Sequence, residues 1–327
     1  MKAVVLVGGA GTRLRPLTLT TPKQMLPVGG RPMIERVVEH LAGHGVDHVV
    51  LSLGYRPDAF IDAYPDGRCG EIALSYAVED TPLDTAGAIA FAARRGGVDA
   101  TFLVVNGDVL TDLDVSALVA FHRDHAAETT IALTPVADPS GFGVVLTDAD
   151  GRVTAFIEKP SPGQAPTNLV NAGTYVCEPS MLERIPAGRP VSIERETFPS
   201  LVAGGSLYAM ASSAPWTDVG TPERYLEANL ALAAADGIAS GVDPSATVSE
   251  AVLGAGVRIA AQATVQRAVL FDRVQVEPGA VVRDSIVGRD AVIGRGATVD
   301  ALSVIGDGAE VTAGSVVRGA RMPKMTP

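Results

Sequence analysis

A short repeat in the last quarter of the chain constrains its fold more than any other feature. Similar triplets begin at Ala246, Ala263, Ala280, Ala297 and Ser315, at spacings of 17, 17, 17 and 18 residues. Within each unit, branched aliphatic residues fall about every six positions. Three six-residue segments per turn, with glycines at the corners, predict a triangular parallel β-helix. At roughly 4.8 Å per turn, five turns would make a prism about 24 Å long.

The composition of this segment differs from that of the rest of the chain. Phe271 is the only aromatic residue after position 241, and no histidine follows His125. Aliphatic ladders fill the interior of a small β-helix, which accounts for the near absence of aromatic residues. We therefore expect two domains, residues 1–240 and residues 241–327.

The charge is distributed just as unevenly. The chain has 26 Lys and Arg against 37 Asp and Glu, a net charge of −11, and residues 242–327 hold nine of each sign. The whole excess of acid therefore belongs to the first 241 residues. This balance argues against a general nucleic-acid binder and against a protein held on anionic lipid by charge. With 47% hydrophobic residues, the chain has enough apolar side chains for a packed core.

Cysteine content and hydropathy bear on the compartment. Cys69 and Cys177 are too few for a disulfide framework and lack metal-ligand spacing, so a reducing cytoplasm is expected. The apolar run 3–7 is too short for a secretory signal, and glycine-rich basic sequence follows it. No apolar stretch approaches the ~18 residues of a membrane span. We expect a soluble protein that does not contact membranes.

Short apolar runs alternate with helical patterns as far as about residue 135. Strands are expected at 3–7, 48–53, 74–78, 102–105 and 130–133, and helices at 33–42, 57–64, 85–94 and 116–125. This alternation predicts a Rossmann-like, mostly parallel α/β sheet with helices on both faces. Ligands bind at the carboxyl ends of such strands, so the loops that follow strands are candidate sites. Later strands are expected at 143–147, 153–157, 172–177 and 207–211, before a helix that Thr221 caps.

The loop after the first strand is rich in glycine and carries two cations. Gly8, Gly9 and Gly11 are followed by Arg13 and, ten residues later, by Lys23. Backbone N–H groups of such a loop can approach phosphates closely, and the cations can neutralise them. The spacing fits neither the P-loop nor the dinucleotide-binding fingerprint. The alternative is a tight structural turn beside a solvated basic pair.

Six motifs in a fixed order resemble the signatures of one enzyme family. They are GGAGTRLRPLTLTTPKQMLPV (8–28), PLDTAGAI (82–89), NGD (106–108), FIEKP (156–160), NAGTYV (171–176) and WTDVGTP (216–222). Together they resemble the sugar-1-phosphate nucleotidyltransferases, which join a nucleoside triphosphate to a sugar 1-phosphate and release pyrophosphate. The resemblance covers residues 2 to about 235 and continues into the repeat. It implies the family's mostly parallel α/β fold and a left-handed β-helix.

The resemblance also implies two sets of binding residues. The nucleotide site would comprise Leu6, Gly8, Gly9, Gly11, Thr12, Arg13, Lys23, Glu79, Gly87 and Asp108. The sugar-phosphate site would comprise Gly143, Glu158, Lys159, Asn171, Gly173 and Asp218. Within these sets Arg13, Lys23 and Asp108 would be catalytic.

The chemistry of this reaction fits the residues. A phosphate oxygen attacks the α-phosphorus of the triphosphate in line, so positioning and charge neutralisation are the main tasks and no protein nucleophile is required. Arg13 and Lys23 would screen the triphosphate, and Asp108 and Asp218 would hold Mg²⁺. The alternatives are that Asp108 caps a turn, Asp218 pairs with an arginine, and Glu158 and Lys159 form a surface pair.

The later motifs resemble one branch of the family most. SIERETFPSL (192–201), LYAM (207–210) and WTDVG are similar to the mannose-1-phosphate guanylyltransferase branch, which makes GDP-mannose from GTP. Glu79 could accept hydrogen bonds from guanine. Asp84 departs from this branch, which usually has glycine there, and would alter nucleotide or sugar choice if the position needs a positive φ. Glucose 1-phosphate with dTTP or UTP, and a cyclitol or heptose phosphate, remain alternatives.

Other classes of function are less consistent with the sequence. Acetyl transfer on a β-helix uses a histidine base, and no histidine lies beyond residue 241. A non-catalytic nucleotide-sugar-sensing subunit would not need the metal-binding carboxylates, and a dinucleotide redox enzyme would need different glycine spacing. The open edges of the β-helix need covering. We therefore expect a homodimer or a higher homo-oligomer.

Overall fold

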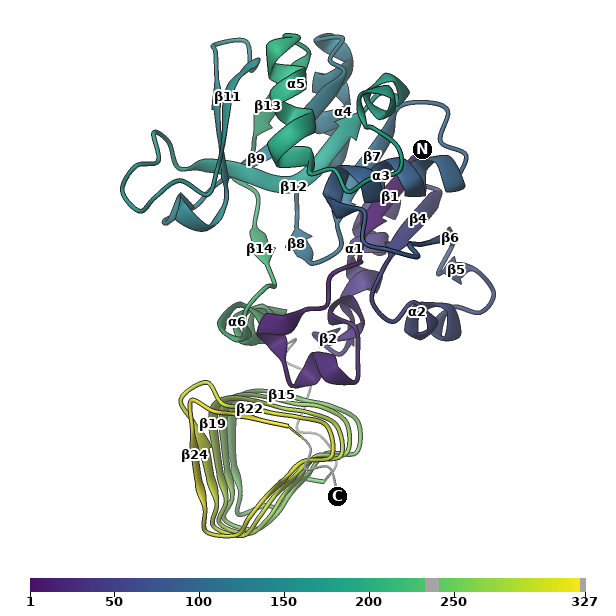
Figure 1. Cartoon of the computed structure of the whole chain (residues 1–327). Coiled ribbons are helices and arrows are strands. Elements are labelled where there is room, and N and C mark those ends of the chain that lie inside the picture. Colours follow the sequence, from purple (N-terminus) through teal and green to yellow (C-terminus); the bar gives the residue numbers. More distant parts are fainter. Residues whose placement is uncertain (233–240, 324–327) are drawn as a thin grey trace. The chain divides into compact units, whose positions relative to one another are not determined.

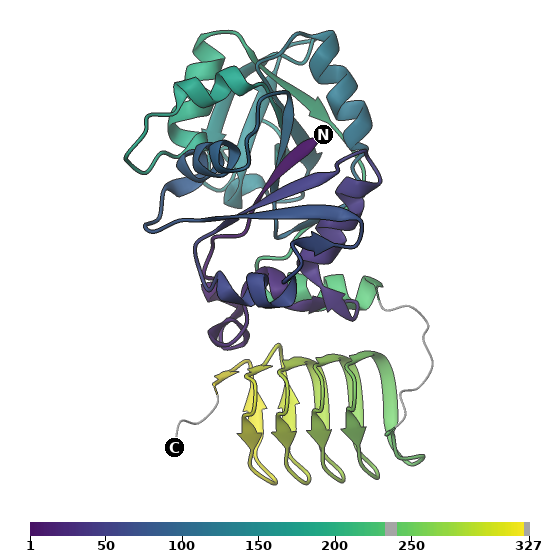
Figure 2. The ribbon, with the colours of Figure 1, turned by 90° about the vertical axis from the view of Figure 1, so that its right-hand side faces the viewer.

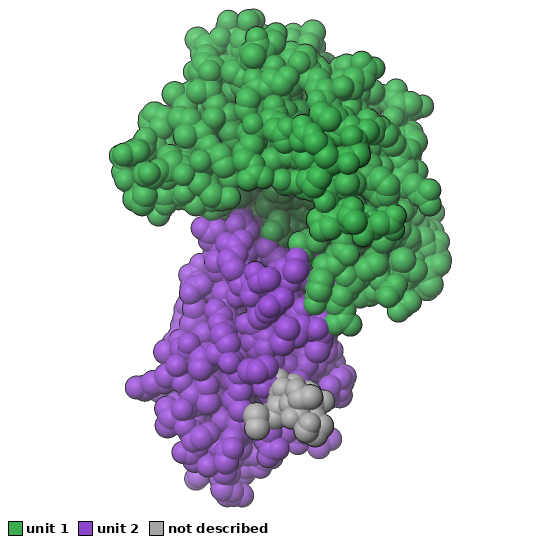
Figure 3. All heavy atoms as spheres, viewed as in Figure 1, with its two compact units in different colours: residues 1–9, 34–216 green, residues 10–33, 217–327 purple. Residues whose placement is uncertain are grey.

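The structure is a computed structural model that describes residues 1–232 and 241–323. Compactness divides the chain into two units, shown in different colours in Figure 3. The first unit comprises residues 1–9 and 34–216, and the second comprises residues 10–33 and 217–327. The domain boundary expected near residue 240 falls in 233–240, outside the described residues.

The first unit is built on a ten-stranded mixed sheet (Figure 1). Four parallel strands form its centre in the order β7-β1-β4-β6. They span Phe102–Asn106, Lys2–Leu6, His48–Leu53 and Ile72–Val78, respectively. These are the strands predicted from apolar runs. Central residues of β1, β4 and β7, such as Val4, Val50 and Val104, have no exposed surface because helices cover the sheet.

The other half of this sheet is largely antiparallel. β12 (Leu169–Cys177) runs antiparallel to β7, to β9 (Thr129–Pro135) and to β10 (Gly143–Thr147). β11 (Val153–Glu158) pairs with β10 in antiparallel orientation, and β13 (Leu207–Ala211) lies parallel to β9. The sheet is therefore mixed and mostly parallel at its centre, which confirms the predicted α/β class.

Helices and short segments complete the first unit. The helices are α1 (Met33–Ala42), which begins at the unit boundary, α2 (Asp58–Ala63), α3 (Asp84–Arg95), α4 (Val115–Asp124) and α5 (Phe198–Ala203). A π-helical turn spans Ile193–Thr197, and 3₁₀ turns span Pro139–Gly141 and Pro179–Arg184. Short strands are β5 (Arg68–Cys69) and β8 (Val109–Thr111). α4 begins where Asp114 accepts a hydrogen bond from the Ala117 N–H at 2.9 Å, as a helix cap does.

The second unit contains the predicted β-helix, whose turns stack in Figure 2. Its longer ladder contains β15 (Thr247–Leu253), β17 (Thr264–Leu270), β19 (Val281–Val287), β21 (Thr298–Asp300), β24 (Val316–Arg318), β22 (Val304–Ile305) and β25 (Arg321–Met322). A second ladder contains β16 (Arg258–Ile259), β18 (Gln275–Val276), β20 (Val292–Ile293) and β23 (Glu310–Val311). Val265 pairs with Val248 and Val282, so neighbouring turns align one 17-residue repeat apart, in parallel. The repeat thus predicted both the architecture and the register.

Most of the loop between β1 and α1, residues 10–33, also belongs to the second unit. It holds three 3₁₀ turns, η1 (Thr12–Leu14), η2 (Leu17–Leu19) and η3 (Lys23–Met25), and then β2 (Pro27–Val28) and β3 (Arg31–Pro32). β14 (Trp216–Asp218) leads to α6 (Pro222–Leu232), where the Arg224 N–H lies 3.4 Å from the hydroxyl of Thr221, the expected cap. Among the described helices, none has the length and apolarity to cross a membrane.

Candidate functional site

The loops that follow the parallel strands of the first unit converge at one edge of the sheet. The Val7 N–H, just after β1, donates to the carbonyl of Ser52 in β4 at 3.0 Å. A β-carbon at Gly8 would lie 3.5 Å from the Gly54 nitrogen and 3.9 Å from Glu79 Oε1. This is the carboxyl edge, where a doubly wound sheet binds its ligands.

The carboxylate of Glu79 organises the loop that follows β6. Its Oε1 accepts a hydrogen bond from the Ser52 hydroxyl at 3.1 Å, and its Oε2 accepts one from the Leu83 N–H at 3.0 Å. Each oxygen keeps a second lone pair for another donor. Sequence reasoning missed Ser52, although it stands out as the one polar residue within 49–53 of β4.

Asp84 occupies the conformation that favours glycine. Its φ is +59°, the left-handed region that most side chains avoid and that Asp and Asn tolerate best. Its Oδ2 lies 2.8 Å from Arg195 Nη2, and its Oδ1 accepts from the Thr85 N–H at 2.8 Å. The departure from glycine therefore keeps a glycine-like backbone and adds an ion pair to the turn Ile193–Thr197.

The NGD and NAG motifs meet inside the first unit. A β-carbon at Gly173 would fall 2.5 Å from Asn106 Nδ2, so the two motifs are in contact. Asn171 Oδ1 accepts from the Gly173 N–H at 2.9 Å, and its Nδ2 lies 2.9 Å from the Tyr175 hydroxyl. Burial raises the pKa of Tyr175, so its hydroxyl stays protonated. Asn106, within the NGD motif, is therefore a further candidate site residue, and its place beside Gly173 was not evident from the sequence.

The other predicted sugar-side residues of the first unit lie on β10, β11 and the turn after β11. Lys159 Nζ is 2.8 Å from Glu158 Oε1, and the Lys159 side chain is 65% exposed. A β-carbon at Gly143 would lie 3.1 Å from Glu158 Oε2, so glycine leaves room beside this carboxylate. Glu158 and Lys159 thus form the pair considered above, with the cation directed to solvent.

A pocket of about 500 Å³ opens beside two predicted nucleotide residues. Its lining includes Glu79, Leu83 and Gly87, together with the cations Arg94 and Arg189. Gly87 lies in α3, and its N–H donates to the carbonyl of Val191 at 3.2 Å. The pocket has both apolar and polar walls, as small-molecule sites do.

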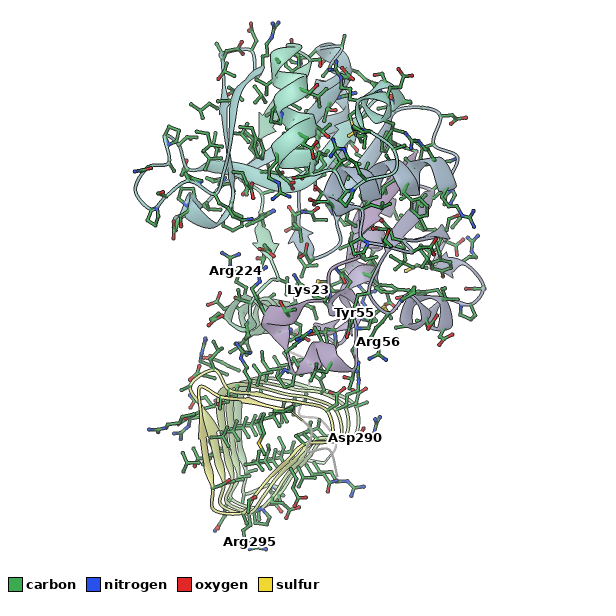
Figure 4. The ribbon with its side chains drawn as sticks, viewed as in Figure 1. Lys23, Tyr55, Arg56, Arg224, Asp290 and Arg295 are labelled. Atoms are coloured by element: carbon green, nitrogen blue, oxygen red, sulfur yellow. The ribbon has the colours of Figure 1, made fainter. Side chains whose placement is uncertain are left out.

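In the second unit, the glycine-rich loop encloses Lys23. Gly11 has φ +58°, and a β-carbon there would fall 2.9 Å from Thr18 Cγ2 and 3.0 Å from Lys23 Cβ. The Thr18 hydroxyl donates to the Gly11 carbonyl at 2.9 Å. Lys23, labelled in Figure 4, is only 5% exposed, so it is not the solvated surface cation of the alternative interpretation. A lysine held at such low exposure is costly unless anionic or hydrogen-bonding groups surround it.

Arg13 lies close to the carboxylate of Asp218. A β-carbon at Gly220 would lie 2.7 Å from Arg13 Nη2 and 2.8 Å from Asp218 Oδ1. Asp218 Oδ2 also pairs with Arg224 Nη1 at 3.2 Å, and Arg224 is labelled on α6 in Figure 4. Asp218 therefore does pair with an arginine, Arg224, and its carboxylate also lies close to Arg13.

Asp108 lies in the turn between β7 and β8 of the first unit and is half-buried. The described residues contain no group of three or more His, Cys, Asp or Glu side chains that could hold a metal. Mg²⁺ usually takes only one or two carboxylates and completes its shell with water and substrate phosphates. Asp108 in the first unit and Asp218 in the second are each a ligand of the kind that Mg²⁺ takes.

The structure thus groups the predicted residues into two sets. The second unit holds Gly11, Thr12, Arg13, Lys23 and Asp218. The first unit holds Leu6, Gly8, Gly9, Glu79, Gly87, Asp108, Gly143, Glu158, Lys159, Asn171 and Gly173. Within the first unit, Gly8 lies near Glu79, Asn171 bonds Gly173, and Gly143 lies near Glu158.

These features define a class of protein. A mixed α/β sheet with a glycine-rich, cation-bearing loop after its first strand is a nucleotide-binding enzyme fold. Residues 2–235 match the family described as Nucleotidyl transferase, and residues 238–325 match the one described as GMPPB C-terminal domain. The chain belongs to the nucleotidyl transferase family, which confirms the family expected from the six motifs.

Individual relatives agree with this assignment. The protein named Mannose-1-phosphate guanylyltransferase from Mycobacterium tuberculosis is 41% identical over 318 residues, which is 96% of this chain and 82% of that protein. HddC from Yersinia pseudotuberculosis, solved in complex with GMP-PN, is 31% identical with a TM-score of 0.60, covering 69% of this chain and 97% of that one. A putative glucose-1-phosphate thymidylyltransferase from Bacillus anthracis is 25% identical with a TM-score of 0.65, covering 73% of this chain and 98% of that one.

Proposed function

We propose that this protein transfers GMP from GTP to mannose 1-phosphate, forming GDP-mannose and releasing pyrophosphate. The single observation that carries the choice of substrates is the 41% identity, over 96% of this chain, to the mycobacterial protein named Mannose-1-phosphate guanylyltransferase. The complex of HddC with GMP-PN supports a guanine nucleotide.

The reaction forms one phosphorus–oxygen bond and breaks another. A phosphate oxygen of mannose 1-phosphate attacks the α-phosphorus of GTP, and the bond from that phosphorus to the bridging oxygen of the β-phosphate breaks. Catalysis then depends on holding both anions in line and on neutralising the charge that develops on pyrophosphate. Arg13 and Lys23 supply these cations, and the low exposure of Lys23 strengthens its field because little water screens it.

The other predicted residues have binding roles in this proposal. The backbone of Leu6, Gly8, Gly9, Gly11, Thr12 and Gly87 shapes the nucleotide site, and Glu79 offers its remaining lone pairs to guanine. Gly143, Glu158, Asn171 and Gly173 bind the sugar hydroxyls, and Lys159 binds the sugar's phosphate. The Lys159 side chain is 65% exposed, so a phosphate in solution can approach its amine.

Asp108 and Asp218 are the proposed carboxylate ligands of Mg²⁺. When bound, the ion would draw electron density from the phosphate oxygens and neutralise part of the charge on the triphosphate. The two aspartates would otherwise repel the substrate, so two negative charges beside a phosphate site need a cation. Arg13 and Arg224 already offset Asp218 in part.

We also propose a cytoplasmic homo-oligomer. Cys69 and Cys177 are not joined in a disulfide, which suits a reducing compartment. Val316, in β24 of the longer ladder, is 65% exposed and would be covered by a second copy. Light scattering of the full chain tests the assembly, and a particle mass of one chain at all concentrations would contradict it.

One second candidate has a specific observation in its favour. The Bacillus anthracis structure is named a putative glucose-1-phosphate thymidylyltransferase, and it has the higher TM-score of the two structures compared. Glucose 1-phosphate with dTTP is therefore the alternative pair, with identity of 25% against 41% for the guanylyltransferase.

A substrate panel separates these candidates. Pyrophosphate release would be measured for ATP, CTP, GTP, UTP and dTTP, each with the 1-phosphates of mannose, glucose, fucose and N-acetylglucosamine, with and without Mg²⁺. We expect the highest kcat/KM for GTP with mannose 1-phosphate. A preference for dTTP with glucose 1-phosphate would select the second candidate. Failure of every pair would refute nucleotidyl transfer.

A further inference from the structure

Residues 10–33, which carry Arg13 and Lys23, pack within the same compact unit as the β-helix, although more than 200 residues separate them in sequence. In Figures 1 and 2 the loop 10–33 and α6 lie along one face of the β-helix. The β-helix therefore contacts the segment that carries Arg13 and Lys23.

Asp307, at a corner of the β-helix, makes the first of these contacts. Its Oδ2 accepts a hydrogen bond from the hydroxyl of Thr20 at 2.7 Å. Its Oδ1 accepts one from the backbone N–H of Arg289, in the preceding turn, at 2.8 Å. The Asp307 side chain is 18% exposed. One carboxylate thus joins two turns of the β-helix to the loop through bonds that its negative charge strengthens.

Arg289 makes the second contact. Its Nη1 donates to the hydroxyl of Thr21 at 2.9 Å and lies 3.8 Å from Asp307 Oδ2. Its guanidinium carbon lies 5.6 Å from the centre of the Phe271 ring, a cation–π arrangement. Asp307 and Arg289, two adjacent side chains of opposite charge, therefore hold Thr20 and Thr21.

The corner on which these residues stand breaks the regularity of the repeat. One corner position recurs at residues 254, 271, 288 and 306. Glycine occupies it at 254, 288 and 306, and Phe271 replaces glycine in the turn between the first two of these. The Phe271 ring lies under Arg289 and 6.3 Å from the ring of Tyr225 in α6. The only aromatic residue of the segment is thus placed where the β-helix meets the rest of the unit.

Gly306 permits close approach of the loop. A β-carbon there would fall 3.1 Å from Pro16 Cβ and 3.2 Å from the carbonyl oxygen of Met322. Pro16 itself is buried. The last turns of the β-helix therefore contact the loop at Pro16, Thr20 and Thr21.

These contacts are connected to the cationic residues by short hydrogen-bonded turns. The Thr21 N–H donates to Leu17 at 3.4 Å, and the Thr18 hydroxyl donates to Gly11 at 2.9 Å. A β-carbon at Gly11 would in turn touch Lys23 Cβ at 3.0 Å. Thr20 and Thr21 are therefore linked through these contacts to the backbone that carries Lys23.

We propose that Asp307 and Arg289 are positioning residues that hold the phosphate-binding loop in its productive conformation. This inference deepens the proposed function and rests on it, because the loop is assigned to the triphosphate there. The β-helix then contributes to catalysis through Thr20 and Thr21, in addition to any role in assembly.

Asp272 provides a matched control. It stands one position after Phe271, as Asp307 stands one position after Gly306. Its Oδ1 accepts from the Ala255 N–H at 2.9 Å, the same contact between turns that Asp307 makes. Asp272→Ala therefore removes the corner hydrogen bond, and Asp307→Ala removes that bond together with the contact to Thr20.

The experiment compares Thr20→Val, Thr20→Ser, Asp307→Ala and Asp272→Ala in the full-length protein. KM for GTP, KM for mannose 1-phosphate and kcat would be measured for each, with hydrogen exchange of the loop amides in the same samples. Loss of a charge-assisted hydrogen bond is expected to raise KM for GTP about tenfold in Thr20→Val and Asp307→Ala. KM for mannose 1-phosphate should stay within about twofold, because its proposed ligands lie mostly on the first unit.

Thr20→Ser keeps the hydroxyl and should behave as the parent, and Asp272→Ala should leave loop exchange unchanged. Parent-like kinetics and loop exchange in Thr20→Val would overturn the proposal. So would equal losses in Asp272→Ala and Asp307→Ala, because they would indicate a purely structural corner. If the parent shows no activity on any substrate pair, the proposed function fails, and loop exchange still decides whether Asp307 holds the loop.

Discussion

The carboxylate of Asp84 lies 2.8 Å from Arg195 Nη2 and joins the first turn of α3 to the turn Ile193–Thr197. Asp84 is also one of the non-glycine residues with a positive φ, +59°. The positive φ of Asp84 lowers the free energy of unfolding, and its ion pair with Arg195 raises it. Substitutions at the two positions can measure these contributions separately.

Asp84→Gly should leave stability nearly unchanged. Relief of the left-handed backbone should gain about 1 kcal/mol, and loss of an ion pair whose arginine is 69% exposed should cost less than about 1 kcal/mol. Thermal unfolding measures the sum, and Arg195→Gln isolates the ion pair. The ratio of kcat/KM for GTP to that for dTTP should also stay within about threefold, because glycine takes the same backbone path. A tenfold change in that ratio would show that Asp84 selects the nucleotide.

Lys23→Met tests the low-exposure cation. Met preserves most of the volume and removes the charge, so the fold should persist while kcat falls roughly 10²-fold or more. Arg15→Met is the matched control, because Arg15 is an exposed cation of the same loop with no assigned role. Steady-state kinetics with GTP would measure kcat for both variants and for the parent. Equal effects of the two substitutions would mean that the loop contributes only general positive charge.

Asp108→Asn and Asp218→Asn test the proposed metal ligands. Each should lower kcat by roughly 10²-fold at saturating Mg²⁺, and chelation of Mg²⁺ should abolish turnover of the parent until the ion is restored. Arg224→Gln is the control for Asp218, since it breaks the 3.2 Å ion pair and leaves the carboxylate in place. Retention of parent activity in either asparagine variant would remove that aspartate from the site.

His122 should make the protein less stable in weak acid. Its ring is 1% exposed and contacts Thr130 and Glu178 at 2.9 and 3.1 Å. Burial lowers the pKa of His122, with partial opposition from Glu178. Below about pH 6.5 the unfolded state therefore binds more protons than the folded state, and the free energy of unfolding falls as pH falls.

Chemical denaturation between pH 8 and pH 5.5 measures this slope. His122→Gln should reduce it without removing it, since burial also lowers the pKa values of His40 and His48. His125, which is not fully buried and bonds the Phe121 carbonyl, supplies a comparison variant, His125→Gln. An unchanged slope in His122→Gln would exclude His122 as a source of acid sensitivity.

The sequence was most informative where structure depends on local repetition. The β-helix follows from the 17-residue spacing because parallel turns place equivalent side chains directly above one another, as Val248, Val265 and Val282 show. The strands β4 and β10 also match their predicted bounds, because continuous apolar runs between turn signals mark buried strands.

Long-range pairing was not predictable in this way. Nothing in the periodicity of β9 indicates that it lies between β12 and β13, because local patterning carries no information about strand partners. The same limit applies to the bond between Thr20 and Asp307, 287 residues apart. The site motifs were found from the sequence, but the contacts that support them, such as Ser52 with Glu79, required the structure.

A competition assay tests the central claim most directly. The protein would be given mannose 1-phosphate and an equimolar mixture of ATP, CTP, GTP, UTP and dTTP with Mg²⁺, and the nucleotide sugars would be separated by anion-exchange chromatography and identified by mass. We predict that GDP-mannose predominates, with one pyrophosphate released for each molecule formed. A different predominant nucleotide sugar, or no nucleotide sugar at all, would contradict the account.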